Sequence, residues 1–283
     1  MAALEMRTFG KGDRKVTAVG LGGEGILRTY GRGKEAEAVI REALAAGITY
    51  FDSAQAYAGS EEYYGSVWSN EPEKRRGIFQ ASKSVDRDRA GAELTLERTL
   101  ARMGTDHLDL WQIHDVRSFP ELTAIEGPDG ALGAFVEARE AGLVRNIGVT
   151  GHHDPSVLTY AVENWPVDSV MMPVNPVEGA LGGFLDTTLP AAREQGMAVI
   201  GMKVLGASHY LDPDGGITAD LLIRYALAQD ISVVIVGCST PGEVRALAAA
   251  GRGAAPLADE EQNLLVDVFR PYARELAYYR GTF

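Results

Sequence analysis

A recurring pattern constrains the fold of this chain more than any other feature: a helix-like segment, a glycine, then a short apolar run. It occurs at Gly47, Gly142 and Gly196. Glycine is favoured just past a helix end, where the backbone needs a positive φ. The runs that follow are rich in Val and Ile and too short for helices, so buried strands are predicted there. Repetition of helix, glycine and strand favours βα units and a parallel sheet.

Eight such strands, separated by helices, predict an α/β fold of the closed (β/α)8 type. Such barrels typically need about 250 residues, so the 283-residue chain is expected to form one domain spanning 1–283. An open doubly wound sheet is the alternative. It is disfavoured because residues 20–25 match the Gly-x-Gly-x-x-Gly fingerprint only in part. The expected strands are 18–21, 48–51, 78–81, 108–113, 143–149, 169–172, 198–202 and 233–236, and the clearest helices are 35–46, 90–102, 131–140 and 219–228.

Two additions to the barrel are predicted at the ends of the chain. Residues 7–17 form a hairpin pattern around Lys11-Gly12-Asp13, which is expected to close the bottom of the barrel. Residues 259–270 predict an extra C-terminal helix that stops near Pro271, because proline cannot continue a helix.

Composition and charge limit the possible partners. The net charge of −12 and the pI of about 4.9 argue against binding to nucleic acid or to anionic membranes. No apolar run of about 18 residues is present, so no membrane span is expected. The single cysteine, Cys238, excludes an internal disulfide and a multi-cysteine metal site, and no metal site is predicted. A cytoplasmic monomer or weak homo-oligomer is the expectation.

Polar residues stand at the ends of three successive predicted strands. Asp52 and Tyr57 follow the second strand, Lys83 the third and His114 the fourth. Each has an ordinary structural explanation alone; Lys83 and Asp52, for example, could simply form an ion pair. Neighbouring strand ends meet at one side of a barrel mouth. Together the four residues therefore predict a site that moves a proton.

The chain resembles the aldo-keto reductases over nearly its whole length. The specific matches are residues 47–57 with Lys83 and His114, and weaker ones follow at 147–150 and 235–239. The resemblance implies a (β/α)8 barrel that binds a nicotinamide cofactor without a Rossmann fold. It also implies that a tyrosine, a lysine, an aspartate and a histidine are catalytic.

The roles implied for these residues are chemically coherent. Reduction of a carbonyl leaves negative charge on oxygen, and Tyr57 would protonate that oxygen. A phenol has a pKa near about 10, which a neighbouring cation lowers. Lys83 is that cation, Asp52 would hold it, and His114 would orient the carbonyl or share the proton.

The resemblance also implies a set of cofactor contacts, although this part of the sequence departs from the family pattern. Thr150-Gly151 stands where a Ser-Asn pair is usual, and Met202 stands where an aromatic residue usually stacks on the nicotinamide. The expected contacts are Gly22, Gly23, Asp52, Thr150, Gly151, Asn175, Met202, Lys203, Gly206, Gly237, Cys238, Ser239, Glu243 and Arg245.

The segment after Gly237 opens a predicted helix, whose free amides suit a phosphate. Thr240 and Glu243 fit a capping box with Pro241 at the first helical position. Arg245 is the nearest basic residue for the extra phosphate of NADP, so NADP(H) is favoured and NAD(H) remains possible.

The predicted function is reduction of an aldehyde or ketone, or oxidation of the corresponding alcohol or sugar, with a small-molecule substrate. Two alternatives stay open. One is a nucleotide-sensing regulatory subunit of the same fold. The other is a class I aldolase that forms a Schiff base on Lys83 or Lys203.

Overall fold

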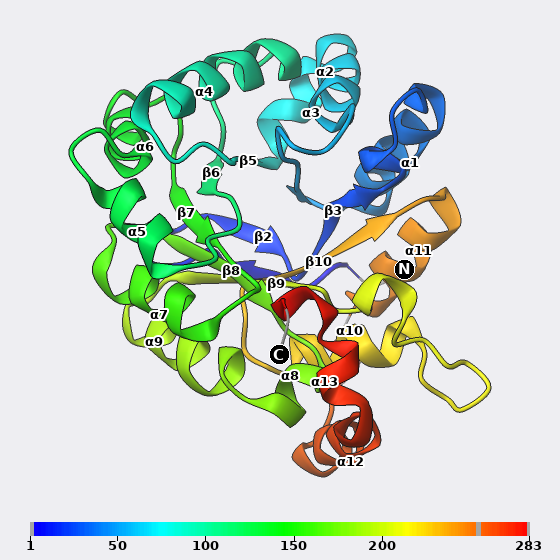
Figure 1. Ribbon diagram of the computed structural model, residues 1–283. Helices are drawn as coiled ribbons and strands as arrows, with labels where there is room; N and C mark the ends of the chain where they lie inside the picture. The colour runs from blue at the N-terminus through cyan, green and yellow to red at the C-terminus, as the bar shows by residue number, and fades with distance from the viewer. Residues whose placement is uncertain (1–2, 253–255, 282–283) are drawn as a thin grey trace.

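The computed structural model describes residues 3–252 and 256–281. Eight parallel strands close into a barrel in the order β10-β3-β4-β5-β6-β7-β8-β9, so each strand lies beside its neighbour in the chain (Figure 1). This confirms the predicted (β/α)8 fold. The barrel strands are β3 (Val19–Gly25), β4 (Tyr50–Phe51), β5 (Phe79–Ser84), β6 (Leu110–Ile113), β7 (Ile147–Thr150), β8 (Ser169–Pro173), β9 (Ala198–Met202) and β10 (Val233–Cys238).

Helices surround the barrel and bury their apolar faces against it (Figure 1). The glycines that follow the helices adopt positive φ as expected, with values of 87° at Gly47, 75° at Gly142 and 62° at Gly196. The helices are α1 (Gly33–Ala46), α2 (Ser60–Asn70), α3 (Pro72–Gly77), α4 (Arg89–Met103), α5 (Phe119–Glu126), α6 (Ala131–Glu140), α7 (Pro155–Asn164), α8 (Pro176–Leu181), α9 (Leu189–Glu194), α10 (Ala219–Leu227), α11 (Pro241–Ala250), α12 (Asp259–Phe269) and α13 (Ala273–Leu276).

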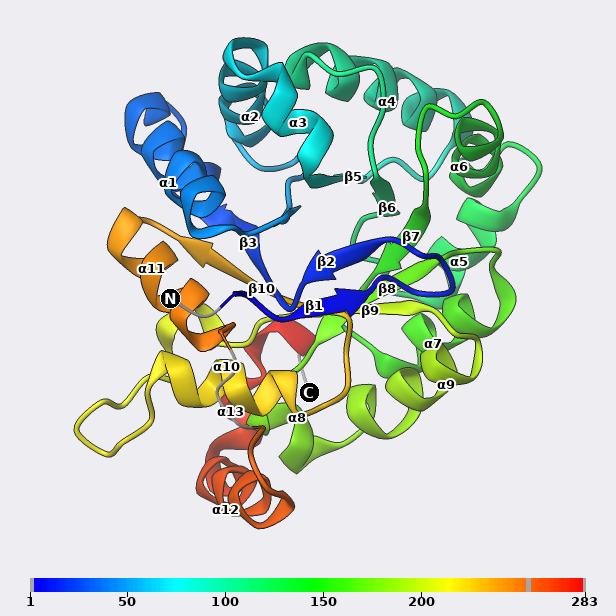
Figure 2. The ribbon, with the colours of Figure 1, turned by 180° about the vertical axis from the view of Figure 1, so that it is seen from behind.

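The predicted hairpin lies across the bottom of the barrel (Figure 2). Its strands β1 (Met6–Thr8) and β2 (Lys15–Thr17) pair antiparallel. Phe9, in the turn between them, packs inside the barrel against Tyr50 and Phe79. The hairpin thereby closes the end of the barrel opposite the strand ends that carry Asp52, Lys83 and His114.

Strand boundaries differ from the predicted ones where polar residues stand at strand ends. The third barrel strand was expected to end at Ala81, but β5 extends to Ser84 and includes Lys83. The fifth was expected to begin at Leu143, but β7 begins at Ile147, and only an isolated bridge between Leu108 and Val144 precedes it.

The C-terminal helix forms as predicted, but the chain does not stop there. After α12 it turns at Pro271 and continues through α13 and a short 3-10 turn at Tyr278–Arg280. This C-terminal segment, red in Figure 1, lies over the face of the barrel away from the hairpin. No helix among the described residues is long and apolar enough to cross a membrane.

Candidate active site

The structure brings the four predicted catalytic residues together. Asp52 directly follows β4, Lys83 lies in β5, and His114 directly follows β6. These three strands are neighbours in the barrel. Tyr57 lies in the turn after β4, and its ring meets the His114 ring edge-on with 5.7 Å between centroids.

Lys83 and Asp52 form a buried ion pair at the base of this site. Lys83 Nζ lies 2.6 Å from Asp52 Oδ2 and also donates to the Ser53 carbonyl at 2.8 Å. Both side chains are only 1% exposed. Burial raises the pKa of the Asp52 carboxyl and lowers the pKa of the Lys83 ammonium, while the charge of each partner opposes these shifts. Substitution of either residue alone destabilises the fold, because it leaves an uncompensated buried charge.

Two cations flank the ring of Tyr57. Lys83 Nζ lies 5.0 Å from the ring centroid, and Arg28 Cζ lies 5.2 Å from it. Gly23 provides the space for the ring, since a Cβ at that position would come within 2.7 Å of it. Arg28, from the turn that follows β3, was not foreseen because nothing in its local sequence marks it.

The pKa of Tyr57 does not shift in the direction expected from the sequence. Burial raises the pKa of the phenol well above its ordinary value, and the charge of Asp52 adds to this effect. The charge of Arg28 lowers the pKa but does not reverse the shift. The Tyr57 hydroxyl is therefore protonated at neutral pH, which is the state from which a proton donor must start.

His114 is neutral over the physiological pH range. Burial lowers the pKa of its imidazole to about 3, and the charge of Lys83 acts in the same direction. Its Nδ1 is buried and has no hydrogen-bond partner among the described residues. A neutral imidazole can donate a hydrogen bond to a carbonyl oxygen, so this environment favours orientation of the substrate over proton sharing.

At the rim of the barrel, the backbones of β3 and β10 lie so close together that only glycine fits between them. A Cβ on Gly22 would lie 2.8 Å from the Gly237 amide nitrogen, and one on Gly237 would strike Glu24 at 2.8 Å. Gly25 adopts a φ of 71° and packs as closely against Cys238. These glycines are thus required by the close packing of β3 against β10 and by the Tyr57 ring. Contact of Gly22, Gly23 and Gly237 with a cofactor stays a prediction.

The start of α11 confirms Thr240 as the N-cap, but the predicted capping box forms only in part, because Glu243 bonds to the amide of Ser239 and not to that of Thr240. Thr240 Oγ1 accepts from the Glu243 amide at 3.3 Å, and the Glu243 carboxylate accepts from the Ser239 amide at 2.7 Å. Arg245 is 62% exposed and pairs with Glu42 at 3.2 Å. Cys238 is buried, and burial raises the pKa of its thiol to about 12, so it stays protonated.

The remaining predicted cofactor contacts are spread around the mouth after β7, β8 and β9. Thr150 Oγ1 accepts from the Asp115 amide at 2.7 Å, and Gly151 follows it. Asn175 is fully buried and donates both amide protons, one to the Lys203 carbonyl and one to Tyr279 Oη. Both donors of the Asn175 side-chain amide are therefore in use, and the bond to Tyr279 links the start of α8 to the C-terminal segment. Met202 is half-buried at the end of β9, Lys203 follows it, and Gly206 takes a φ of 53° over the Tyr210 ring.

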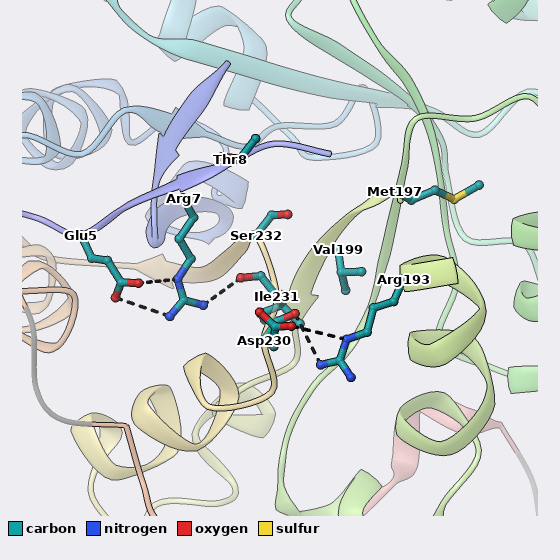
Figure 3. Close-up of a pocket in the computed structure, with 9 residues that line it drawn as sticks. All are labelled: Glu5, Arg7, Thr8, Arg193, Met197, Val199, Asp230, Ile231 and Ser232. Atoms are coloured by element: carbon teal, nitrogen blue, oxygen red, sulfur yellow. Dashed lines mark hydrogen bonds and ion pairs between the residues drawn. The ribbon is translucent and has the colours of Figure 1, made fainter. Parts of the chain in front are cut away.

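A cavity of about 400 Å³ lies at the other end of the barrel (Figure 3). Arg7 there binds Glu5 and the Ile231 carbonyl, and Arg193 binds the backbone at Gln229. The hairpin separates this cavity from the catalytic residues. It is therefore not the substrate site. Its lining residues are Glu5, Arg7, Thr8, Arg193, Met197, Val199, Asp230, Ile231 and Ser232.

The structure is thus a closed (β/α)8 barrel with a tyrosine beside a buried lysine–carboxylate pair at its mouth. The model of the Aldo/keto reductase family matches residues 18–215, and the chain belongs to that family. It is 27% identical to the L-galactose dehydrogenase of Arabidopsis thaliana over 86% of this chain and 87% of that protein. It is 28% identical to an NADP(+) aldo-keto reductase of Schizosaccharomyces pombe over 72% of this chain and 63% of that one.

Solved structures agree on the fold. An aldo-keto reductase of Bacillus halodurans in its holo form has a TM-score of 0.76 at 21% identity, with 99% of this chain and 98% of that one covered. A Klebsiella pneumoniae aldo-keto reductase in complex with NADPH has a TM-score of 0.75 at 20% identity, covering 95% and 96%.

Proposed function

We propose that this protein reduces an aldehyde or ketone, or oxidises the corresponding alcohol or sugar, with NADP(H) as the hydride carrier and Tyr57 as the proton donor. The observation that carries this proposal is the buried contact of 2.6 Å between Lys83 Nζ and Asp52 Oδ2, beside the protonated phenol of Tyr57. Family membership and the NADP(H) named for two of its relatives support it.

Each of the four residues has its own role in the proposed reaction. The bound cofactor would supply hydride to the carbonyl carbon. The Tyr57 hydroxyl donates its proton to the carbonyl oxygen as negative charge develops there. Lys83, 5.0 Å from the ring, stabilises the phenolate that Tyr57 becomes, and Asp52 fixes the position of Lys83. Neutral His114 donates a hydrogen bond that orients the carbonyl.

The substrate and the cofactor require a direct measurement. Purified protein is mixed with NADPH or with NADH and a panel of aldehydes, ketones and sugars, and the absorbance of the reduced cofactor is followed. We expect NADPH to be consumed with at least one carbonyl. If reduced cofactor binds but no carbonyl of the panel is turned over, the nucleotide-sensing alternative is favoured instead.

The aldolase alternative places the chemistry on a lysine nitrogen. Lys83 Nζ is held by a carboxylate and a carbonyl oxygen, so a free amine there requires loss of both contacts. Lys203 is half-buried at the mouth and remains the better candidate for a Schiff base. Borohydride trapping with substrate labels the chain if this alternative holds and leaves it unlabelled under our proposal.

Arg245 is our candidate for reading the extra phosphate of NADP. Its pair with Glu42 is exposed, and such pairs contribute at most about 1 kcal/mol. A charge-assisted contact to phosphate is worth about 1.5–3 kcal/mol. Arg245→Ala should thus weaken NADPH binding by roughly ten- to a hundredfold and leave NADH binding nearly unchanged, as measured by quenching of protein fluorescence.

Arg270→Ala is the matched control, because Arg270 is 58% exposed and pairs with Asp267 in α12. It should change neither affinity. Equal binding of NADPH and NADH by the wild type, or equal weakening of both by Arg245→Ala, would show that the choice of NADP(H) is mistaken.

We further propose a cytoplasmic location and a monomer or weak homo-oligomer. The single buried cysteine and the acidic surface charge are compatible with both proposals.

A further inference from the structure

Three side chains from two neighbouring loops meet at the barrel mouth beside His114. Asp115 follows β6, and His152 and His153 follow β7. Asp115 Oδ1 lies 3.2 Å from His152 Nε2 and 3.6 Å from His153 Nε2. One ligand atom from each of the three lies within 4.8 Å of the other two. The proposed reduction assigns no role to this cluster.

The separations of the two imidazoles from Asp115 Oδ1 suit an ion held between the groups. A charge-assisted N–H···O bond usually spans about 2.7–2.9 Å, and both separations from Asp115 Oδ1 are longer. A tetrahedral zinc ion with bonds of about 2.0–2.2 Å places neighbouring ligand atoms roughly 3.3–3.6 Å apart. The two observed separations lie at or close to that range.

The hydrogen bond that His152 makes through Nδ1 leaves its Nε2 atom available to bind a cation. Its Nδ1 lies 2.9 Å from the Tyr279 carbonyl oxygen, which only accepts, so Nδ1 carries the proton. In the neutral ring the lone pair then lies on Nε2, which faces Asp115 Oδ1. Metal-binding histidines commonly donate their second N–H to a backbone carbonyl in this way.

Two atoms of the cluster have no hydrogen-bond partner among the described residues. Asp115 Oδ1 and His153 Nε2 are buried and accept no hydrogen bond from any described residue. The other carboxylate oxygen, Oδ2, receives Arg117 at 2.7 Å. Burial of a polar atom without a hydrogen-bond partner is unfavourable. An ion bound between these atoms would satisfy both of them.

We propose that Asp115, His152 and His153 bind one divalent transition-metal ion, with zinc as the best match to two imidazoles and a carboxylate. Water completes the fourth position. Through the bond from His152 to the Tyr279 carbonyl, the ion joins the loops after β6 and β7 to the C-terminal segment. The sequence predicted no metal site, because the three ligands come from two separate loops.

Calorimetric titration with zinc chloride tests this site in the full-length protein, treated with chelator and carrying no histidine tag. The wild type should bind one equivalent, and His152→Ala, His153→Ala and Asp115→Asn should each weaken binding at least tenfold. His107→Ala is the matched control, because His107 pairs with Asp106 ahead of β6 and should bind as the wild type does. Absence of zinc binding, or full binding by His152→Ala and His153→Ala, overturns the proposal.

A second measurement does not depend on whether the variants fold. Crystals of the wild type soaked in zinc are measured at the zinc absorption edge. An anomalous peak within bonding distance of Asp115 Oδ1, His152 Nε2 and His153 Nε2 supports the site. No peak at this point at saturating zinc contradicts it.

Discussion

Tyr57→Phe should lower the turnover of any carbonyl substrate by at least about a hundredfold, the usual value of general acid catalysis. The substitution removes only the hydroxyl that donates the proton. The ring keeps its edge contact with His114 and its position near Lys83. Cofactor affinity should therefore hardly change. Steady-state kinetics and a cofactor titration on the same preparation measure both quantities.

Tyr64→Phe is the control for this variant. Tyr64 lies in α2, and its hydroxyl is buried with no hydrogen-bond partner among the described residues. It should turn over substrate at the wild-type rate. If Tyr57→Phe retains near-normal turnover, Tyr57 is not the proton donor.

The Lys83–Asp52 pair should behave as one unit in both catalysis and stability. Lys83→Met and Asp52→Asn should each lower turnover by at least about a hundredfold, and the double variant should be about as slow as the slower single variant. Lys83→Met leaves a buried carboxylate unpaired, which destabilises the fold by about 3–5 kcal/mol. The double variant removes both charges and should recover much of that loss in denaturant unfolding.

The exposed pair of Arg89 and Glu137, 2.6 Å apart, provides the matched control cycle. Its single substitutions should have small effects that add in the double variant, because solvent screens both charges. Fully multiplicative losses of turnover in the Lys83–Asp52 cycle would mean that the two residues act independently.

Much of the barrel could be predicted because its signals are local. Glycines after helices, short runs of Val and Ile, and the capping residues Thr240 and Glu243 depend only on neighbours in the chain. The end of β5 was missed because Ser82 and Lys83 are polar. They extend a buried strand only because α2 and β4 supply partners, such as Glu61 at 2.6 Å for Ser82.

The contacts at the mouth could not be predicted in the same way. Tyr279 donates to Glu178 at 2.7 Å across 101 residues of sequence, and Arg280 binds the same carboxylate. No local pattern marks such a contact. The direction of the pKa shift of Tyr57 was also missed, because it depends on how deeply the ring is buried. The adjacent histidines His152 and His153 after β7 were the one available signal for their cluster with Asp115.

Transfer of deuterium is the most direct test of the central claim. The protein is incubated with a carbonyl substrate and with NADPH that carries deuterium on the transferable face of nicotinamide C4, and the product is analysed by mass spectrometry. The account predicts one deuterium on the former carbonyl carbon with the wild type, and product formation slowed at least about a hundredfold with Tyr57→Phe. Product without deuterium on that carbon, or label transfer unchanged by Tyr57→Phe, would contradict it.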